Sequence, residues 1–165
     1  MQTMNDTMSQ IGLTFRKAVP EDDEILIQFR SRFLLELNPE LSLFDQERLK
    51  GEFRDYRRRR SLDGVFQEYL ALIDLIPAGC AAMLLYELPP HLRYSPRWIG
   101  HILNFYTLPE YRCQGIGFRM MEYLISEART HHLASLFLNA TPAGEPLYRK
   151  FGFHPADHTA LVLDL

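Results

Sequence analysis

The chain has 165 residues, of which 47% are hydrophobic and 24% charged, a composition typical of one globular domain with its own core. A net charge of −3 gives no overall attraction to nucleic acid or to an anionic membrane, and no apolar run reaches the roughly 20 residues of a membrane span. The cysteines, Cys80 and Cys113, are too few for a disulfide framework and have no partners at zinc spacing. We therefore expect a reduced, cytoplasmic protein without a metal site, with a polar leader at residues 1–12 and one domain at residues 13–165.

The first half of this domain predicts one strand and two helices. Apolar and polar residues alternate in IGLTFRKAV (11–19), which indicates the strand. A proline and several acidic residues then precede a helical apolar pattern over residues 20–38, and NPELS ends this first helix. A second, more polar helix is expected from about Asp45 to Arg58.

The second half predicts mostly strands, with two further helices. The expected elements are two strands in residues 64–88 joined near IPAG (76–79), a strand at 99–108, a helix after residues 112–117, a strand at 134–140, a short helix in 144–153 ended by Gly152, and a last strand at 158–165. The proline-rich residues 89–98 are expected to form a loop. This order of elements predicts a mixed α/β fold in which a central strand leads into a glycine turn and a helix.

The stretch YRCQGIGFRMM, residues 111–121, places Gly115 and Gly117 between that strand and that helix. The free N–H groups of a helix's first turn converge on one place and favour an anion there, and glycines let a phosphate approach. A Walker loop needs Lys followed by Ser or Thr, which are missing, and Met120 stands where a dinucleotide motif has its third glycine. Taken alone, the turn predicts either a phosphate site or close packing of strand against helix.

Two motifs, in order and on the expected elements, carry a resemblance to a known family. RCQGIG (112–117) resembles the R/Q-x-x-G-x-G/A signature of the GNAT superfamily of acyl-CoA N-acyltransferases, and LNFYTLPEYR (103–112) resembles the strand and loop that lead into it. GEPLYRKFGF (144–153) resembles the second landmark, a tyrosine followed by a Gly-Phe close. The resemblance implies a mixed, mostly antiparallel central sheet flanked by helices, with acetyl-CoA as co-substrate and no metal. Residues 13–65 match only in their pattern of elements.

The resemblance also implies where coenzyme A binds. The amides after the arginine position wrap its pyrophosphate, and the preceding strand, splayed from its neighbour, pairs its backbone with the pantetheine arm. The residues assigned to the coenzyme in this way are Phe105, Tyr106, Thr107, Arg112, Cys113, Gln114, Gly115, Ile116, Gly117, Phe118, Thr141 and Tyr148. Thr141 stands where many relatives have an asparagine, and its hydroxyl could serve that contact, whereas Asn139 lies a full pleat repeat away.

Acetyl transfer to an amine needs a group that takes the amine proton and an acid that protonates the departing thiolate. Tyr148 matches the family tyrosine near the coenzyme sulfur and is the predicted acid, the alternative being an ordinary buried aromatic. His101 is the candidate base, since it titrates near neutrality; the alternative is a histidine bonded to a backbone carbonyl. Asn104 could orient the acceptor or a water, and Glu68 and Glu87 are further candidates.

Two other features suggest chemistry that we do not expect. Cys113 precedes a helix, where a thiol has a lowered pKa, yet the family transfers the acyl group directly from coenzyme to amine. The run RRRR (57–60) is typical of a solvated helix end favoured by the dipole, with docking of an acidic partner or of nucleic acid as alternatives.

We therefore predict an N-acetyltransferase that moves an acetyl group from acetyl-CoA to a primary amine of a small molecule or peptide by direct attack. The alternative is a non-catalytic acyl-CoA sensor of the same fold. The acceptor pocket is expected in the loops at 36–45 and 89–98, where side chains could recognise a carboxylate or an aromatic acceptor: Arg93, Tyr94, Arg97 and Trp98. No nucleic-acid or membrane partner is expected. A homodimer is a further option, because many relatives dimerise.

Overall fold

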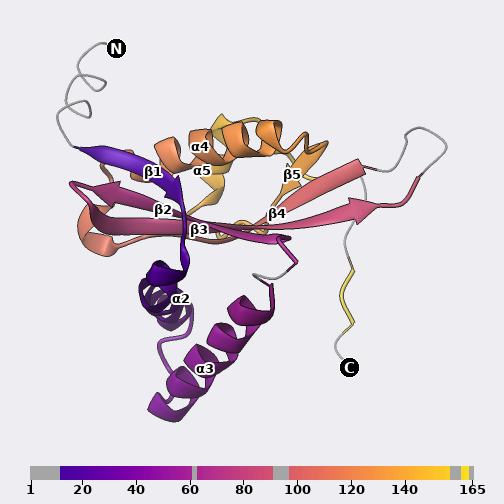
Figure 1. Cartoon of the computed structure of the whole chain (residues 1–165). Helices are drawn as coiled ribbons and strands as arrows, with labels where there is room; N and C mark the ends of the chain where they lie inside the picture. The colour runs from indigo at the N-terminus through magenta and orange to yellow at the C-terminus, as the bar shows by residue number, and fades with distance from the viewer. Residues whose placement is uncertain (1–11, 61–62, 91–96, 157–160, 164–165) are drawn as a thin grey trace.

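The computed structural model describes residues 12–60, 63–90, 97–156 and 161–163, which form one five-stranded sheet with helices on both faces (Figure 1). In chain order the elements are β1 (Leu13–Lys17), η1 (Pro20–Asp22), α2 (Asp23–Leu37), α3 (Leu43–Arg60), β2 (Phe66–Ile73), β3 (Ile76–Leu88), β4 (Arg97–Thr107), η2 (Pro109–Tyr111), α4 (Ile116–Thr130), β5 (Ser135–Phe137) and α5 (Glu145–Lys150). The strands lie in the order β1-β2-β3-β4-β5, antiparallel from β1 through β4, with β5 parallel to β4. The expected mixed, mostly antiparallel sheet flanked by helices is confirmed.

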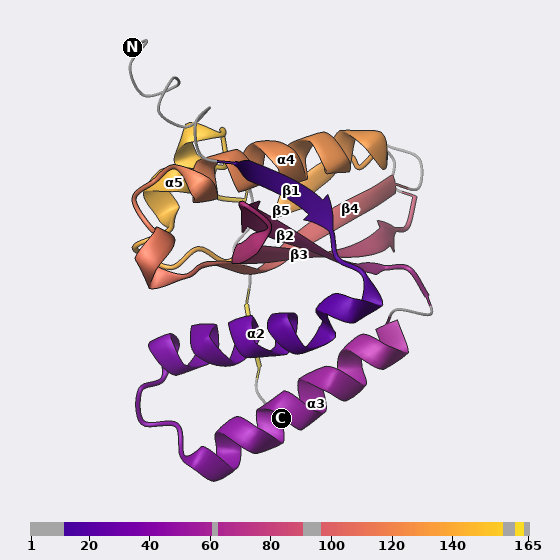
Figure 2. The same ribbon diagram turned by 60° about the vertical axis from the view of Figure 1, so that its left-hand side comes forward.

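The sheet separates two hydrophobic cores, because successive side chains of a strand point to opposite faces. Helix α4 lies on one face, and α2 and α3 lie on the other (Figure 2). In β2, Tyr69 and Ala71 pack in the core under α4, whereas Leu70 and Leu72 pack in the core under α2. This strand is buried on both sides, which explains why it is apolar at most positions instead of alternating.

The hairpin between β2 and β3 turns at a place that the sequence analysis missed. Asp74 and Leu75 form the two-residue turn, both with positive φ (48° and 70°), where glycine or asparagine is the usual choice. The expectation of a turn near IPAG is therefore wrong, since those residues lie inside β3. Gly79 is needed for another reason: a Cβ there would come within 2.7 Å of the Tyr106 carbonyl oxygen on β4.

Some predicted boundaries also shift. Helix α3 begins at Leu43, two residues before the expected start, where the Ser42 hydroxyl accepts the Asp45 N–H at 3.1 Å. β5 spans only three residues of the seven expected. Of the last strand expected at 158–165, only residues 161–163 are described, and they are exposed and lie outside the sheet (Figure 1). Among the described helices, none is both long and apolar enough to cross a membrane.

Candidate active site

The site begins where two neighbouring strands separate. β4 pairs with β5 only from Ile99 to His101, although it continues to Thr107. The register with β3 shifts between Cys80 and Ala82, and opposite this point Asn104 adopts a positive φ of 50°, as the extra residue of a β-bulge does. The second half of β4 therefore has no strand partner on its β5 side among the described residues, and the backbone there can pair with another molecule.

The turn after β4 presents a row of unused amide donors. Cys113 and Gly115 both have positive φ (58° and 80°), and Gly115 caps the start of α4 without any side-chain hydrogen bond. Within the described part of the chain, no acceptor is bonded to the backbone N–H of residues 113–118; the first amide of this helix to find one is Arg119, bonded to the Gly115 carbonyl at 3.1 Å. Such a row at a helix N-terminus fits a phosphate-bearing group, because the N–H groups and the helix dipole act together.

Arg112 holds this turn against helix α2. Its Nε donates to the Thr107 carbonyl at 2.9 Å, and its Nη2 lies 2.7 Å from Oε2 of Glu36 near the end of α2. The Tyr106 hydroxyl donates to Oε1 of the same carboxylate at 2.5 Å. Burial, together with the Glu36 carboxylate, raises the pKa of Tyr106 to about 12. Of the residues assigned to the coenzyme, Arg112 and Tyr106 thus have side chains already engaged within the protein.

Beside the separated strands lies a cavity of about 150 Å³. It brings together His101, Asn104, Phe105, Thr141 and Tyr148, all singled out in the sequence, and none of residues 112–118 lines it. The remaining lining residues come from helix α2, β4 and the segment after β5: Arg30, Phe33, Ile102, Leu103, Leu138 and Asn139. The cavity and the amide row therefore lie at two ends of the same strand and turn.

Tyr148 enters the cavity from the short helix α5. Its ring packs edge-on against Phe105 and Phe153, at centroid distances of 5.8 and 6.0 Å. Gly144 lets the ring lie close, because a Cβ there would be 3.1 Å from Cε2 of Tyr148. Burial raises the pKa of Tyr148, so its hydroxyl keeps its proton at neutral pH and can donate it.

His101 lies at the end of the paired part of β4. Its ring stacks on Phe137 of β5, with centroids 4.0 Å apart. Its Nε2 is buried and has no hydrogen-bond partner in the described part of the chain, so the predicted alternative, a bond to a nearby carbonyl, is not formed by this atom. Burial lowers the pKa of His101, which keeps the imidazole neutral and able to accept a proton.

Asn104 has a partner that sequence reasoning missed. Its Oδ1 accepts a hydrogen bond of 2.5 Å from Nη1 of Arg30, a residue of α2 that also lines the cavity. The signal was present in the helical spacing, because Arg30 follows Leu26 by four residues and so lies on the apolar stripe that faces the sheet. A charged residue on such a stripe needs an explanation.

The other predicted candidates have different surroundings. Thr141 accepts the Gly144 N–H at 3.2 Å and so helps to start α5 while lining the cavity. Cys113 is exposed at the turn. Glu68 is paired with Arg57 at 2.6 Å, and Glu87 is exposed on β3, so neither lines the cavity.

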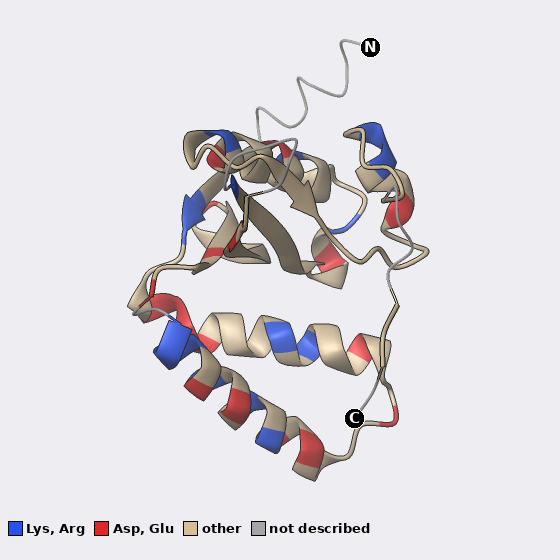
Figure 3. Cartoon of the chain, turned by 90° about the vertical axis from the view of Figure 1, so that its right-hand side faces the viewer, with Lys and Arg blue, Asp and Glu red and all other residues tan. Residues whose placement is uncertain are grey.

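The four arginines at the end of α3 are mostly paired with carboxylates. Arg57 is buried and contacts both Glu68 (2.6 Å) and Asp23 (2.7 Å), which differs from the solvated end that was expected. Arg60 pairs with Asp63, and Arg58 with Asp55. Figure 3 shows basic and acidic residues interspersed along this helix. Such a surface gives no strong field for a polyanion.

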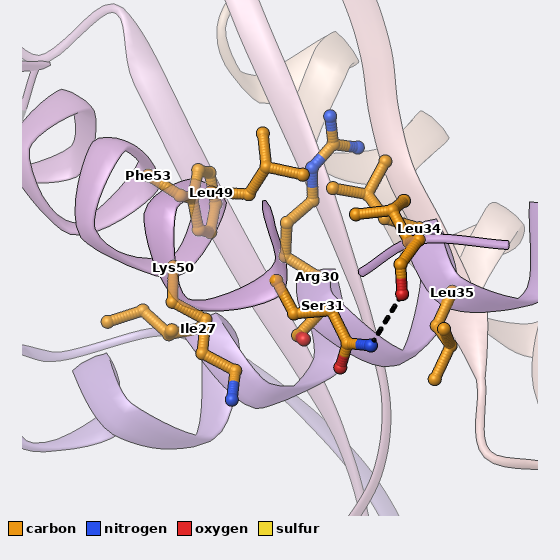
Figure 4. Close-up of a pocket in the computed structure, with 10 residues that line it drawn as sticks. Ile27, Arg30, Ser31, Leu34, Leu35, Leu49, Lys50 and Phe53 are labelled. Atoms are coloured by element: carbon orange, nitrogen blue, oxygen red, sulfur yellow. Dashed lines mark hydrogen bonds between the residues drawn. The ribbon is translucent and has the colours of Figure 1, made fainter. Parts of the chain in front are cut away.

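Of the loops expected to form the acceptor pocket, none of the described residues (36–45, 89, 90, 97 and 98) lines the cavity. Arg93 and Tyr94 lie outside the described residues, and Arg97 and Trp98 begin β4. A second pocket, between α2 and α3, has a volume of only about 10 Å³, at the lower limit for one water. Figure 4 shows the Arg30 guanidinium pointing out of this small pocket, at the opposite side from the Lys50 amino group. Helix α2 contributes Arg30 and Phe33 to the lining of the larger cavity.

Comparisons with known proteins point to one family and one fold. A model described as the acetyltransferase (GNAT) family matches residues 31–153. A crystal structure, with acetyl-CoA, of a predicted acetyltransferase from Clostridium acetobutylicum is similar with 26% identity and a TM-score of 0.77, covering 92% of this chain and 96% of that one. A GCN5-related N-acetyltransferase from Ralstonia eutropha has 26% identity and a TM-score of 0.76, with 92% and 99% covered. No curated protein matches. Among the described residues, no group of three or more metal-binding side chains occurs.

Proposed function

Because the chain belongs to the acetyltransferase (GNAT) family, whose members use an acyl-CoA, we propose that it moves an acetyl group from acetyl-CoA to a primary amine of a small molecule or peptide. Family and fold support an acyl-CoA-dependent acetyltransferase in general. The observation that carries the finer proposal is the amide row of residues 113–118, which stands at the end of the strand whose cavity holds His101 and Tyr148.

Coenzyme A fits the groups that are present. Its diphosphate would accept hydrogen bonds from the amides of residues 113–118, and its pantetheine amides would pair with the unpartnered backbone of Phe105 to Thr107. Packing within the described part of the protein does not require glycine at position 117, since a Cβ there would only touch Leu147 and Phe105 at 3.4 and 3.6 Å. When bound, the coenzyme supplies the activated acetyl thioester.

Side chains of the cavity then accept and donate the protons. His101 Nε2 takes a proton from the acceptor amine, whose nitrogen forms the new bond to the acetyl carbon. Tyr148 gives its hydroxyl proton to the sulfur as the carbon–sulfur bond breaks. Backbone N–H groups of β4, free on the β5 side, stabilise the oxygen that becomes negative.

The proposal is tested by calorimetry with coenzyme A, followed by a thiol-release screen with acetyl-CoA. The acceptors are amino acids, polyamines, aminoglycosides and peptides with free N-termini. We expect coenzyme binding and release of thiol with at least one class, together with an acetylated amine by mass spectrometry. Tight coenzyme binding without thiol release above the hydrolysis rate for any class would instead identify a non-catalytic sensor.

A further inference from the structure

Arg30 brings a positive charge into the cavity that holds His101 and Tyr148. It extends from α2, and its side chain lies near two aromatic rings, with its guanidinium carbon 5.7 Å from the Phe33 centroid and 5.9 Å from the Phe53 centroid. Its one hydrogen bond among the described residues goes to the neutral amide oxygen of Asn104. That bond uses Nη1 and leaves donors on the other nitrogens of the guanidinium fork.

No carboxylate neutralises this charge within the described residues. Arg57, the other arginine withdrawn from solvent on this side of the sheet, shows the usual arrangement, with Glu68 at 2.6 Å and Asp23 at 2.7 Å. Glu36, the acidic residue of α2 near the turn, is already bonded to Arg112 and Tyr106. A half-buried guanidinium without a counter-ion is unfavourable, and burial accordingly lowers the pKa of Arg30.

We propose that Arg30 binds an anionic group of the acceptor, so that the preferred acceptors are small amines that carry a carboxylate or a phosphate. This inference rests on the proposed function and names its substrate class. Carboxylate and phosphate match the planar guanidinium fork, and either would supply the missing counter-ion. The cavity of about 150 Å³ is smaller than the roughly 300 Å³ at which drug-sized pockets begin, which favours a compact acceptor.

The geometry also separates this anion from the phosphates of the coenzyme. Arg30 lines the cavity together with His101, whereas none of residues 112–118, which form the amide row and its anchor, lines it. An acceptor whose anionic end lies on Arg30 can thus present its amine to His101 while the amide row remains free for the diphosphate. Asn104 holds the guanidinium in place for this contact through its Oδ1, which makes it a positioning residue.

The test compares matched acceptors that differ only in the anionic group. Each amino acid is compared with its amide, and phosphoethanolamine with ethanolamine, using kcat/KM corrected for amine ionisation. We expect at least one anionic acceptor to exceed its neutral partner by about 30-fold or more, as a lost charge-assisted contact implies. Arg30→Met should abolish this advantage, acting mainly on KM, and change the neutral partner by less than about threefold. The two series distinguish a carboxylate from a phosphate.

The control variant is Arg48→Gln, which removes the same charge from the exposed side of α3, where Arg48 pairs with Asp45 and Glu52 of its own helix. It should keep the preference. Arg30→Lys keeps the charge without the fork and serves if Arg30→Met melts much earlier. Equal kcat/KM values for the anionic and neutral acceptors in the wild type would overturn the inference. So would an equal loss of kcat/KM for both acceptors in Arg30→Met, because Arg30 would then act only by supporting the bulge at Asn104.

Failure of the proposed function would look different. If no amine gives thiol release, titration calorimetry with glycine and phosphoethanolamine, in the presence of coenzyme A, still reads the anion site. Heat that disappears in Arg30→Met and persists in Arg48→Gln supports the anion site even without transfer. Thiol release with neutral amines alone, and no anion-dependent heat, leaves the transferase standing and overturns the role of Arg30.

Discussion

The two ends of the site are built from different parts of the protein. The end proposed to bind the coenzyme is backbone: the half of β4 that has no strand partner on its β5 side among the described residues, and six consecutive amides, all between residues 104 and 118. The end proposed to bind the acceptor is made of side chains that come from separate elements, with Arg30 on α2, His101 on β4 and Tyr148 on α5. A site made of backbone requires particular φ values and missing Cβ atoms, whereas a site made of side chains requires only that distant elements pack together.

This difference predicts how substitutions act. Changes to His101 and Tyr148, the cavity side chains proposed to act on protons, should reduce turnover while leaving coenzyme affinity intact. Backbone changes in the turn should reduce coenzyme affinity while leaving turnover nearly intact once the coenzyme is saturating. A substitution that lowers both equally would contradict the separation of the two ends.

The largest effect is expected for Tyr148→Phe. It removes the hydroxyl proposed to protonate the thiolate and keeps the ring that packs on Phe105, so kcat should fall by about 1,000-fold with little change in the Kd of coenzyme A. A thiol-release assay measures kcat, and calorimetry measures the Kd of coenzyme A. Tyr56→Phe is the control, because that tyrosine packs on Phe66 and does not line the cavity. A fall of less than about threefold in kcat would assign Tyr148 to positioning the thioester instead.

The second effect concerns His101 and pH. Burial lowers the pKa of His101, so its imidazole stays neutral at pH values below the ordinary histidine pKa of 6.5. The value of kcat should therefore fall only as the pH drops through that lowered pKa. His101→Gln should reduce kcat at pH 7 by about 100-fold and remove this acid limb. A pH profile of kcat from 5 to 9, measured for both proteins, checks it. An unchanged acid limb in the variant would mean that another group, or the amine itself, titrates there.

The third effect tests the backbone end. Gly115→Ala places a side chain at φ 80°, which costs an L-residue about 1–2 kcal/mol. The free turn can relieve this strain by leaving the conformation that presents its amides, and coenzyme A must restore that conformation, so we expect its Kd to rise by about 10-fold with kcat nearly unchanged. Gly64→Ala is a matched control, since Gly64 also has a positive φ (69°) but faces open space away from the site. The melting temperature should fall by a similar amount in both variants. Equal coenzyme affinities in the two would show that the turn does not contact the diphosphate.

How far the sequence predicted each part follows from the same contrast. The turn at 112–117 was found because its glycines are visible in the sequence, and the overall order of elements followed from the periodicity of apolar residues. The hairpin at Asp74 and Leu75 was misplaced because neither residue is the glycine that a positive φ favours. Arg30 was missed because its role depends on α2 packing over β4, 74 residues away, where it meets Asn104. The helical spacing could place Arg30 on the apolar face of α2, but a partner so far along the chain leaves no local pattern.

The smallest effect is expected for the contact between Arg112 of the turn and Glu36 of α2, which connects the two ends of the site. This ion pair is 42% and 41% exposed, so it should contribute less than about 1 kcal/mol. If Arg112 acts by holding the turn against α2, then Arg112→Gln and Glu36→Gln should each raise the Kd of coenzyme A by about threefold. The double variant should raise it by no more than either single variant. Calorimetric Kd values for the four proteins complete the cycle.

A direct contact from the Arg112 side chain to a phosphate would give the opposite pattern. Arg112→Gln would then weaken the binding of coenzyme A by about 30-fold, because a charge-assisted hydrogen bond would be lost. Glu36→Gln would leave affinity unchanged or improve it, because Arg112 would be freed from its partner in α2. The sign of the Glu36→Gln effect therefore decides whether the turn binds the coenzyme through backbone alone or recruits a side chain that the unbound protein keeps paired with α2.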